Sequence, residues 1–430
     1  MKKSILFLFI CFATSAQTNK DLTEIVKQVL DHSPALKGQK TGLKIGDVKT
    51  QIQQSYSNPI ISYEAGITRL DPVSKVTFNT GGVPSILQFQ PNMNYNTNFV
   101  ANQVIYDWGK NALALEKSRL ENKLTQVQID VATTQMAYQI STIYHQIKYL
   151  QNVVKIQQSE LSRIKSHAEV VETQVKLGEL LELDQLGINI RLKNQEIKIS
   201  ETELQLNKMI DFLNTQAGKD ISPWLKNNQL NKQDSKGSIE ENPLLLQLNA
   251  EDAILQKEIN VQEKSSSPTI AGIASIGVRN GYLPRINGEV PPISDDFKLN
   301  TALGLKLTIP IYSGKRSFLQ ENILKFQKDR VQLQRDETGA KLSFELRQGE
   351  ANLVQLANKS AIQNQVIEQA VYAYKLAEAR FTKGTIKQIE LDAFQNTLEE
   401  AQLQKENIYL QISLQQLELL KIKGLKFWEL

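Results

Sequence analysis

The sequence has little cysteine. Cys11 is the only one among 430 residues, and it lies in an apolar run near the N-terminus. The residues before it, Phe9 and Ile10, are too large for the cleavage box of a lipoprotein. We therefore expect a mature protein without disulfides, thiol chemistry or a lipid anchor.

Histidine and phosphate-binding motifs are also lacking. The three histidines are His32, His145 and His167. They do not have the spacing of metal ligands. The Gly-Lys pairs 109–110 and 314–315 are not phosphate loops, because Val104 and Ile309 stand where the first glycine is needed. The sequence therefore predicts no metal site, no cofactor and no enzymatic activity.

Charge blocks and long apolar runs are scarce as well. The net charge of +4 is spread along the chain, which favours no nucleic-acid partner. Two lysines, the apolar run Ile5–Ala13 and small residues before Gln17 form the layout of a secretory signal peptide, residues 1–16. No later run reaches the roughly 18 residues of a membrane-spanning helix. An exported chain of this kind is secreted, periplasmic or inserted in an outer membrane as β-strands.

One order of segments is present twice. Two pairs of prolines mark it, each pair separated by 209 residues: Pro34 and Pro243, and Pro59 and Pro268. Helical patterns, Leu22–Gln54 and Asn242–Lys264, end where each later proline biases the backbone out of the helix. We infer two internal repeats, residues 17–216 and 241–430, joined by the polar linker 217–240.

Each repeat continues with a predicted strand hairpin, at residues 58–106 and 267–311. The clearest alternation of apolar and other residues lies in Leu299–Ile311. The segments Asp71–Asn94 and Arg279–Lys298 are rich in Gly, Pro and Asn, and we interpret them as the hairpin loops. Strands of this length and alternation suit an outer-membrane barrel.

Long helices are predicted after each hairpin. From Met136 to Val175, steps of four and three residues meet an apolar residue at eleven of twelve positions, which is a coiled-coil seam. The predicted helix at 110–176 would be roughly 100 Å long, so it must pack on neighbours. A weaker seam follows 206 residues later, within a second long helix at 315–383.

Each long helix is expected to reverse at a glycine. Gly178 and Gly384 stand where a helix C-terminus needs a left-handed residue. The return helices, residues 180–216 and 387–423, then run antiparallel. The predicted fold class is α plus membrane β, in which antiparallel coiled-coil helices accompany four strands per chain.

Four strands cannot close a barrel, and open strand edges cannot stand in lipid because their backbone groups would be unpaired. Membrane strands in this chain therefore demand an oligomer. Three chains would supply twelve strands, within the usual range of outer-membrane barrels. A homotrimer with cyclic symmetry follows naturally.

The whole ordered set resembles the TolC-like outer membrane efflux proteins. The sequence motifs that carry the resemblance are "NPIISYEAGI", "VIYDWGK", "IPIYSGK" and "ARFTKGTIKQIELDA". The resemblance implies a homotrimer in outer-membrane lipid whose helical tunnel extends through the periplasm toward an adaptor (membrane fusion) protein and an inner-membrane pump. Such a duct of an efflux or type I secretion system conducts substrates passively. The alternative is a soluble periplasmic coiled-coil adaptor or scaffold.

The resemblance also points to acidic residues after the glycine turns. In the family, the tunnel closes at these tips with acidic side chains facing the axis. Asp184 and Glu390 occupy the matching positions by count from the glycine, and Asp392 lies close to another. Three copies would form a charged ring that screens permeants. The alternative is that acids in a first helical turn, which here include Glu179 and Glu182, only complement the helix dipole.

The family's arginine and tyrosine near the second turn are replaced here by Ile386 and Phe381, so a bonded latch lacks its residues at that point. The turns and the residues before them are candidates for adaptor docking, with solvated helix ends as the alternative: Lys176, Gly178, Phe381, Lys383 and Gly384. A further group marks the strand-to-helix joints: Tyr106, Trp108, Gly109, Tyr312 and Gly314. Its aromatic residues would lie in an interfacial belt or in the core between barrel and tunnel, and its glycines permit the bend.

Overall fold

The computed structural model describes residues 20–225, 237–289 and 296–429. The expected signal peptide and residues 226–236 of the expected linker lie outside this part of the chain. The chain divides into two compact units. The helical unit comprises Met1–Thr41, Gln126–Leu248 and Gln334–Leu430, and the strand unit comprises Gly42–Thr125 and Asn249–Leu333. Each unit therefore draws on both repeats.

The N-terminal helical segment is broken. The prediction of one helix at Leu22–Gln54 is wrong at Ser33, because α1 spans Lys20–His32 and α2 spans Pro34–Ser55. Pro34 has no backbone N–H to continue the helix. Instead, the hydroxyl of Ser33 accepts a hydrogen bond from the amide of Leu36 at 3.3 Å, which caps the start of α2.

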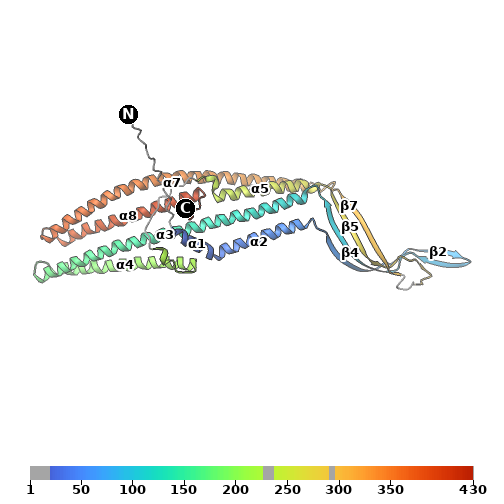
Figure 1. Ribbon diagram of the computed structural model, residues 1–430, viewed down its shortest axis with the longest axis horizontal. Coiled ribbons are helices and arrows are strands. Elements are labelled where there is room, and N and C mark those ends of the chain that lie inside the picture. Colours follow the sequence, from blue (N-terminus) through green and yellow to red (C-terminus); the bar gives the residue numbers. More distant parts are fainter. Residues whose placement is uncertain (1–19, 226–236, 290–295, 430) are drawn as a thin grey trace, which may run out of the picture. The chain divides into compact units, whose positions relative to one another are not determined.

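The remaining helices form two reversing pairs and one further helix. Their bounds are α3 Lys110–Lys176, α4 Glu182–Ala217, α5 Pro243–Glu263, α7 Arg316–Thr382 and α8 Gln388–Ile422. Figure 1 shows α3 reversing into α4, and α7 reversing into α8. Each bound lies within two residues of the range expected from the sequence. Within the described residues, no helix is both long and apolar enough to cross a membrane.

The α3 seam is buried in the helical unit. Ile147 and Val171 are 0% exposed, and they belong to two separate core clusters. The first cluster joins α1, α3 and α4 to Phe427 and Trp428 near the end of the chain. The second joins α3, α4, α7 and α8 toward their turns. The seam thus packs the two repeats together.

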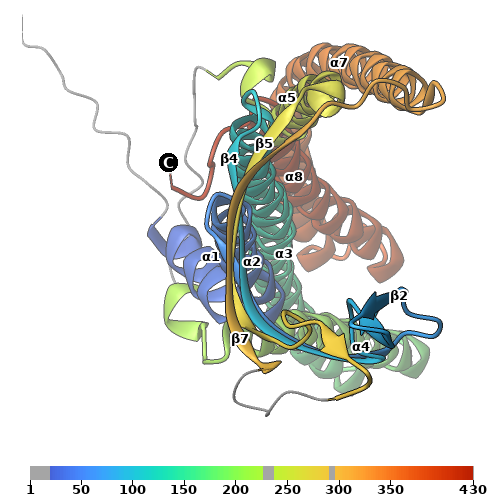
Figure 2. The same ribbon diagram turned by 90° about the vertical axis from the view of Figure 1, so that its right-hand side faces the viewer.

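A four-stranded antiparallel sheet forms the strand unit, in the order β1-β4-β5-β7. The strands are β1 Ile60–Arg69, β4 Met93–Tyr106, β5 Thr269–Arg279 and β7 Lys298–Thr308. Figure 2 shows them as one curved layer. β4 and β5 join the two repeats, whereas the outer edges of β1 and β7 pair with no other described strand. β7 ends before Ile309, earlier than expected, since Pro310 cannot donate to a ladder.

The segment Asp71–Asn94 is not a loop, which corrects the sequence interpretation. It contains β2 Lys75–Thr80 and β3 Val83–Gln88, which pair with each other and, through β3, with the two-residue strand β6 Arg285–Ile286. Gly81 and Gly82 have φ of 62° and 90°, so they supply the left-handed turn that a two-residue hairpin needs. Part of the second expected loop, residues 290–295, lies outside the described residues.

One glycine in β5 sets the approach of two strands. A Cβ at Gly277 would collide with the carbonyl oxygen of Thr97 and lie 2.6 Å from the Cα of Asn98, whereas a Cβ at Gly304 in β7 meets nothing within 4 Å. We expect Gly277→Ala to lower the free energy of unfolding by about 1–3 kcal/mol. Gly304→Ala, the matched control, should change it by less than about 0.5 kcal/mol. Denaturant unfolding of the detergent-purified protein measures both, and equal effects would contradict this account.

Candidate functional site at the helix turns

The two reversing turns have the same backbone geometry. Gly178 and Gly384 have φ of 78° and 69°. The amides of Gly178 and Glu179 donate to two carbonyls in the last turn of α3, at 3.0 and 2.9 Å, and the same pattern recurs within residues 380–385 at 2.8 and 3.0 Å. This pair of bonds is a Schellman motif, which requires a left-handed residue. Both glycines therefore stand where the sequence requires them.

Asp184 and Glu390 each begin a return helix. The amide of Leu181 donates to Oδ2 of Asp184 at 3.1 Å, and the amide of Lys387 donates to Oε2 of Glu390 at 2.8 Å. A carboxylate in the first turn thus satisfies an otherwise orphan amide and complements the helix dipole. The sequence analysis named this stabilising role as the alternative to a charged ring in the tunnel. A role in a constriction stays a prediction.

Asp392 lies in a bridge between the two return helices. It accepts hydrogen bonds from the guanidinium of Arg191 on α4 and from Nε2 of Gln388 at 2.7 Å. Arg191 also donates to the side-chain oxygen of Asn396 at 3.0 Å. A carboxylate between two cross-linked helices is less available to a permeant than a free one. Asp392 therefore differs from Glu390 in its surroundings.

Sequence reasoning missed the other half of this bridge. Glu160 on α3 has a side chain that is 0% exposed, and it accepts from Arg191 at 2.9 Å and from Arg163 at 2.7 and 3.0 Å. A buried carboxylate is tolerated only when cations and hydrogen bonds replace its water. Glu160 stands directly beside the seam position Leu161, so a carboxylate next to a buried seam was the available signal.

A second polar contact lies next to the α7 turn. Nε2 of His167 is 3.6 Å from Glu378, whose carboxylate accepts from the hydroxyl of Tyr374 at 3.0 Å. Burial and the neighbouring Glu378 raise the pKa of Tyr374 above its ordinary value. Phe381 stacks on His167 and is 6% exposed. The expectation that Phe381 belongs to the docking surface of the tip is therefore wrong, because the ring is part of the core.

The exposed surface of the turns combines cationic and apolar residues. Lys176 and Lys383 are exposed, and Lys176 pairs with Glu172 one turn earlier at 2.7 Å. Four apolar side chains are at least two-thirds exposed: Leu177, Leu181, Leu183 and Ile389. Leucines left in water at a helix end indicate a contact surface.

The aromatic residues at the strand-to-helix joints are partly to largely exposed in the single chain, with Trp108 at 37% and Tyr106 at 54%. Tyr106 and Trp108 contact each other edge to face, with ring centroids 4.7 Å apart. Tyr312 is 82% exposed. These side chains are thus not core residues of one chain, and their place in an interfacial belt stays a prediction.

The backbone of the two joints shows that the Gly-Lys pairs 109–110 and 314–315 are not structural counterparts, because their alignment is shifted by one residue. Trp108 and Gly109 both have positive φ, 53° and 82°, and so do Gly314 and Lys315, 65° and 60°. Gly314 is therefore the counterpart of Trp108, 206 residues away, rather than of Gly109. Asp107, which the sequence interpretation passed over, caps α3 by accepting from the amide of Asn111 at 2.7 Å, and it also accepts from the amide of Gly109 at 3.1 Å.

Comparison with known proteins supports one class. The chain has the fold of the outer membrane protein VceC of Vibrio cholerae, with a TM-score of 0.74, 15% identity, and coverage of 95% of this chain and 97% of that one. The outer membrane channel MtrE of Neisseria gonorrhoeae in its open state has a TM-score of 0.74 at 14% identity, and the match covers 95% of this chain and 89% of that one. The outer membrane channel CmeC of Campylobacter jejuni has a TM-score of 0.70 at 14% identity, and the match covers 94% of this chain and 86% of that one. The expected fold class is confirmed.

Residues 236–425, which include most of the second repeat, match the outer membrane efflux protein family. This part of the chain accordingly matches the TolC-like family that the order of the segments predicts. The family places the protein in the outer membrane, from which it extends into the periplasm, and it is a family of transport proteins rather than enzymes. It favours the duct over the soluble adaptor or scaffold. The comparison with curated protein sequences found no match.

The charged bridge yields a stability prediction. Removing Arg191 leaves Asp392 without its guanidinium and Glu160 with one cation instead of two. We expect Arg191→Ala to lower the free energy of unfolding by about 3 kcal/mol, the usual cost of breaking a buried ion pair.

The control is Lys193→Ala on the same helix. Its side chain is 73% exposed and forms a surface ion pair with Glu196 on the same helix, so the change should stay below about 0.5 kcal/mol. Denaturant unfolding followed by circular dichroism distinguishes the two. Equal losses would show that the bridge does not stabilise the helical unit.

Proposed function

We propose that three copies of this chain assemble in the outer membrane as the exit duct of a tripartite efflux or type I secretion system. The observation that carries the proposal is the four-stranded sheet, in which the outer edges of β1 and β7 have no strand partner among the described residues. In lipid each unpaired backbone group costs several kcal/mol. Pairing β7 of one copy with β1 of the next satisfies both edges and closes a barrel of twelve strands.

The side chains of the sheet support contact with lipid. On β7, four leucines alternate with smaller or polar residues, and each is more than half exposed in the single chain: Leu299, Leu303, Leu305 and Leu307. Alternation of this kind gives a barrel one apolar face and one face toward water. Tyr106, the last residue of β4, and Trp108, just beyond it, would then mark the inner edge of the membrane.

The helices provide the periplasmic part of the duct. Their turns carry exposed leucines and lysines around Gly178 and Gly384, which form a surface suited to a periplasmic adaptor that links the duct to an inner-membrane pump. The chain itself conducts substrates passively. The pump selects the substrate and supplies the energy.

The carboxylates after the turns would form the constriction. Asp184 and Glu390 are held at helix starts by hydrogen bonds to backbone amides, which fixes their position near each turn. Three copies of each would attract cations and select among permeants by charge.

Single-channel recording in planar lipid bilayers tests the duct and its constriction together. The wild-type protein should open discrete channels that divalent cations block. Asp184→Asn combined with Glu390→Gln removes the charges but keeps an oxygen that can accept the capping bond. The block of the channel by divalent cations should therefore weaken several-fold.

Glu182→Gln is the control, because Glu182 is exposed in the same first turn and makes no capping bond. It should leave the block unchanged. A wild-type protein without channel activity would refute the duct. If divalent cations block the double variant as strongly as the wild-type protein, both carboxylates act only as helix caps.

A further inference from the structure

The strand register assigns every side chain of the four-stranded sheet to one of two faces. Successive residues of a strand point to opposite faces, and paired residues of neighbouring strands share a face. Leu303 of β7 pairs with Ala274 of β5, whereas Lys298 pairs with Arg279. Lys298 and Arg279 therefore lie on the face opposite to the leucines. In the proposed duct the leucine face contacts lipid, so the opposite face lines the lumen.

The lumen face carries amide, hydroxyl and small side chains along most of its length. They include Ser62, Gly66, Thr68, Asn94, Asn96, Asn98, Asn102, Ser275, Gly277, Asn300, Ala302 and Gly304. Four charged residues of the described strands interrupt this neutral surface: Glu64, Arg279, Lys298 and Lys306. Three of the four are cations, so the lumen face is basic.

Two of these cations stand side by side at the outer end of the sheet, the end farthest from the helices. Arg279 is the last residue of β5 and Lys298 the first of β7. Directly opposite residues have Cβ atoms about 4.5–5.5 Å apart, and like charges in such a pair destabilise a sheet. The same row continues to Asn96 of β4 and Gly66 of β1. It thus contains two positive charges and no negative one.

Arg279 is held in place although it ends a strand. Its guanidinium lies over the ring of Tyr282, 4.5 Å from the centroid. The next residue, Asn280, is 6% exposed, and its side chain accepts from the amide of Tyr95 and donates to the carbonyl of Met93, both at 2.8 Å. These bonds join the end of β5 to β4, so they fix the position from which the guanidinium projects.

Two acids near this end of the sheet are paired with other cations. Asp296 forms an ion pair with Arg285 at 3.8 Å, and Asp71 accepts from Arg69 at 2.5 Å. Each of these pairs is neutral. They therefore do not cancel the charge that Arg279 and Lys298 bring to the lumen face.

We propose that Arg279 and Lys298 of three copies form a cationic ring at the outer end of the lumen, and that this ring binds anions with several phosphate or carboxylate groups. Guanidinium and ammonium groups are the usual protein donors to such anions. A passage lined by one sign of charge concentrates ions of the opposite sign. The leucine face excludes lipid from the ring, so the anion comes from the water in the lumen.

The inference rests on the proposed assembly of three copies, because one chain supplies only two of the cations. The duct then selects by charge at two places. The proposed carboxylates at the helix turns attract cations, and the ring at the outer mouth attracts anions. An exported anion would thus be favoured at the point where it leaves the barrel.

Calorimetric titration with inositol hexakisphosphate tests the ring. The detergent-purified wild-type protein should bind this anion, and added salt should weaken the binding. Arg279→Gln combined with Lys298→Gln removes both charges from the row and keeps polar side chains. The affinity of the double variant should fall by about tenfold or more, since it loses the charge-assisted bonds.

Lys306→Gln is the matched control. Lys306 is on the same strand and the same face, but it lies opposite Ala271, far along β7 from the ring. Its substitution removes a positive charge from the lumen, and the affinity should change by less than about twofold, as expected for a distant and screened charge. An equal loss in the control and in the double variant would overturn the ring, because total charge alone would then explain the binding.

Light scattering of the same samples measures the assembly separately. If the wild-type protein is not a trimer, the proposed function fails and the ring fails with it. If it is a trimer but does not bind the anion, or if the double variant binds it unchanged, the ring is overturned and the duct stands.

A second titration separates a soluble anion from a lipid headgroup. It uses micelles that contain short-chain phosphatidylglycerol. The affinity for inositol hexakisphosphate should stay the same, because the ring faces the lumen. Competition by the lipid in the wild-type protein, absent in the double variant, would assign the two cations to headgroups and would refute the proposal.

Discussion

The unpaired edges of one short sheet are the constraint on which the rest of the structure depends. Four antiparallel strands pair with one another from β1 to β7, and the backbone groups on the two outer sides have no strand partner among the described residues. A lipid environment offers no water to satisfy them. In the proposed assembly a closed ring of copies pairs these groups, and each copy contributes the edge of β1 and the edge of β7.

The helices face the same problem in a different solvent. A helix of 67 residues is stable only when it packs along its length, and α3 does so through a buried seam and a return helix. The repeats are then held together by Arg191 between Glu160 and Asp392, a contact that is costly to break but adds little hydrophobic stabilisation.

Much of the architecture was predictable because periods of two and about 3.5 residues are directly visible in a sequence. The seam from Met136 to Val175 predicted α3, and Gly178 predicted its end. Local chemistry that no period reveals was missed, such as the break at Ser33 and the hairpin around Gly81. Asp107 was a readable signal, because an aspartate before a helix commonly caps it.

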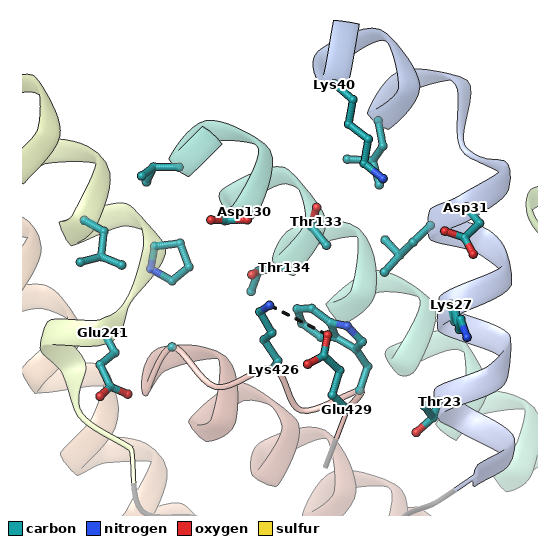
Figure 3. A pocket seen from close by; sticks show the side chains of 17 residues that line it. Thr23, Lys27, Asp31, Lys40, Asp130, Thr133, Thr134, Glu241, Lys426 and Glu429 are labelled. Carbon is teal, nitrogen blue, oxygen red and sulfur yellow. Dashed lines mark ion pairs between the residues drawn. The ribbon is translucent and has the colours of Figure 1, made fainter. Parts of the chain in front are cut away.

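The candidate site was predictable only in part. Counting from the turns located Asp184 and Glu390, but the contacts of Arg191, Glu160 and Asp392 depend on how three helices pack and no single helix shows them. Phe381 was misplaced for the same reason. Figure 3 shows a further pocket in the helical unit, lined by both signs of charge, in which Lys426 pairs with Glu429 at 4.0 Å. Such a mixture favours no one ligand.

Hydrogen–deuterium exchange at the strand edges tests the central claim most directly. In protein extracted from membranes with a mild detergent, the amides of β1 and β7 that point away from the sheet should exchange as slowly as those of the central strands β4 and β5, because a neighbouring copy holds them. Rapid exchange of these edge amides, with slow exchange retained in β4 and β5, would mean that the edges are open and would contradict a closed barrel.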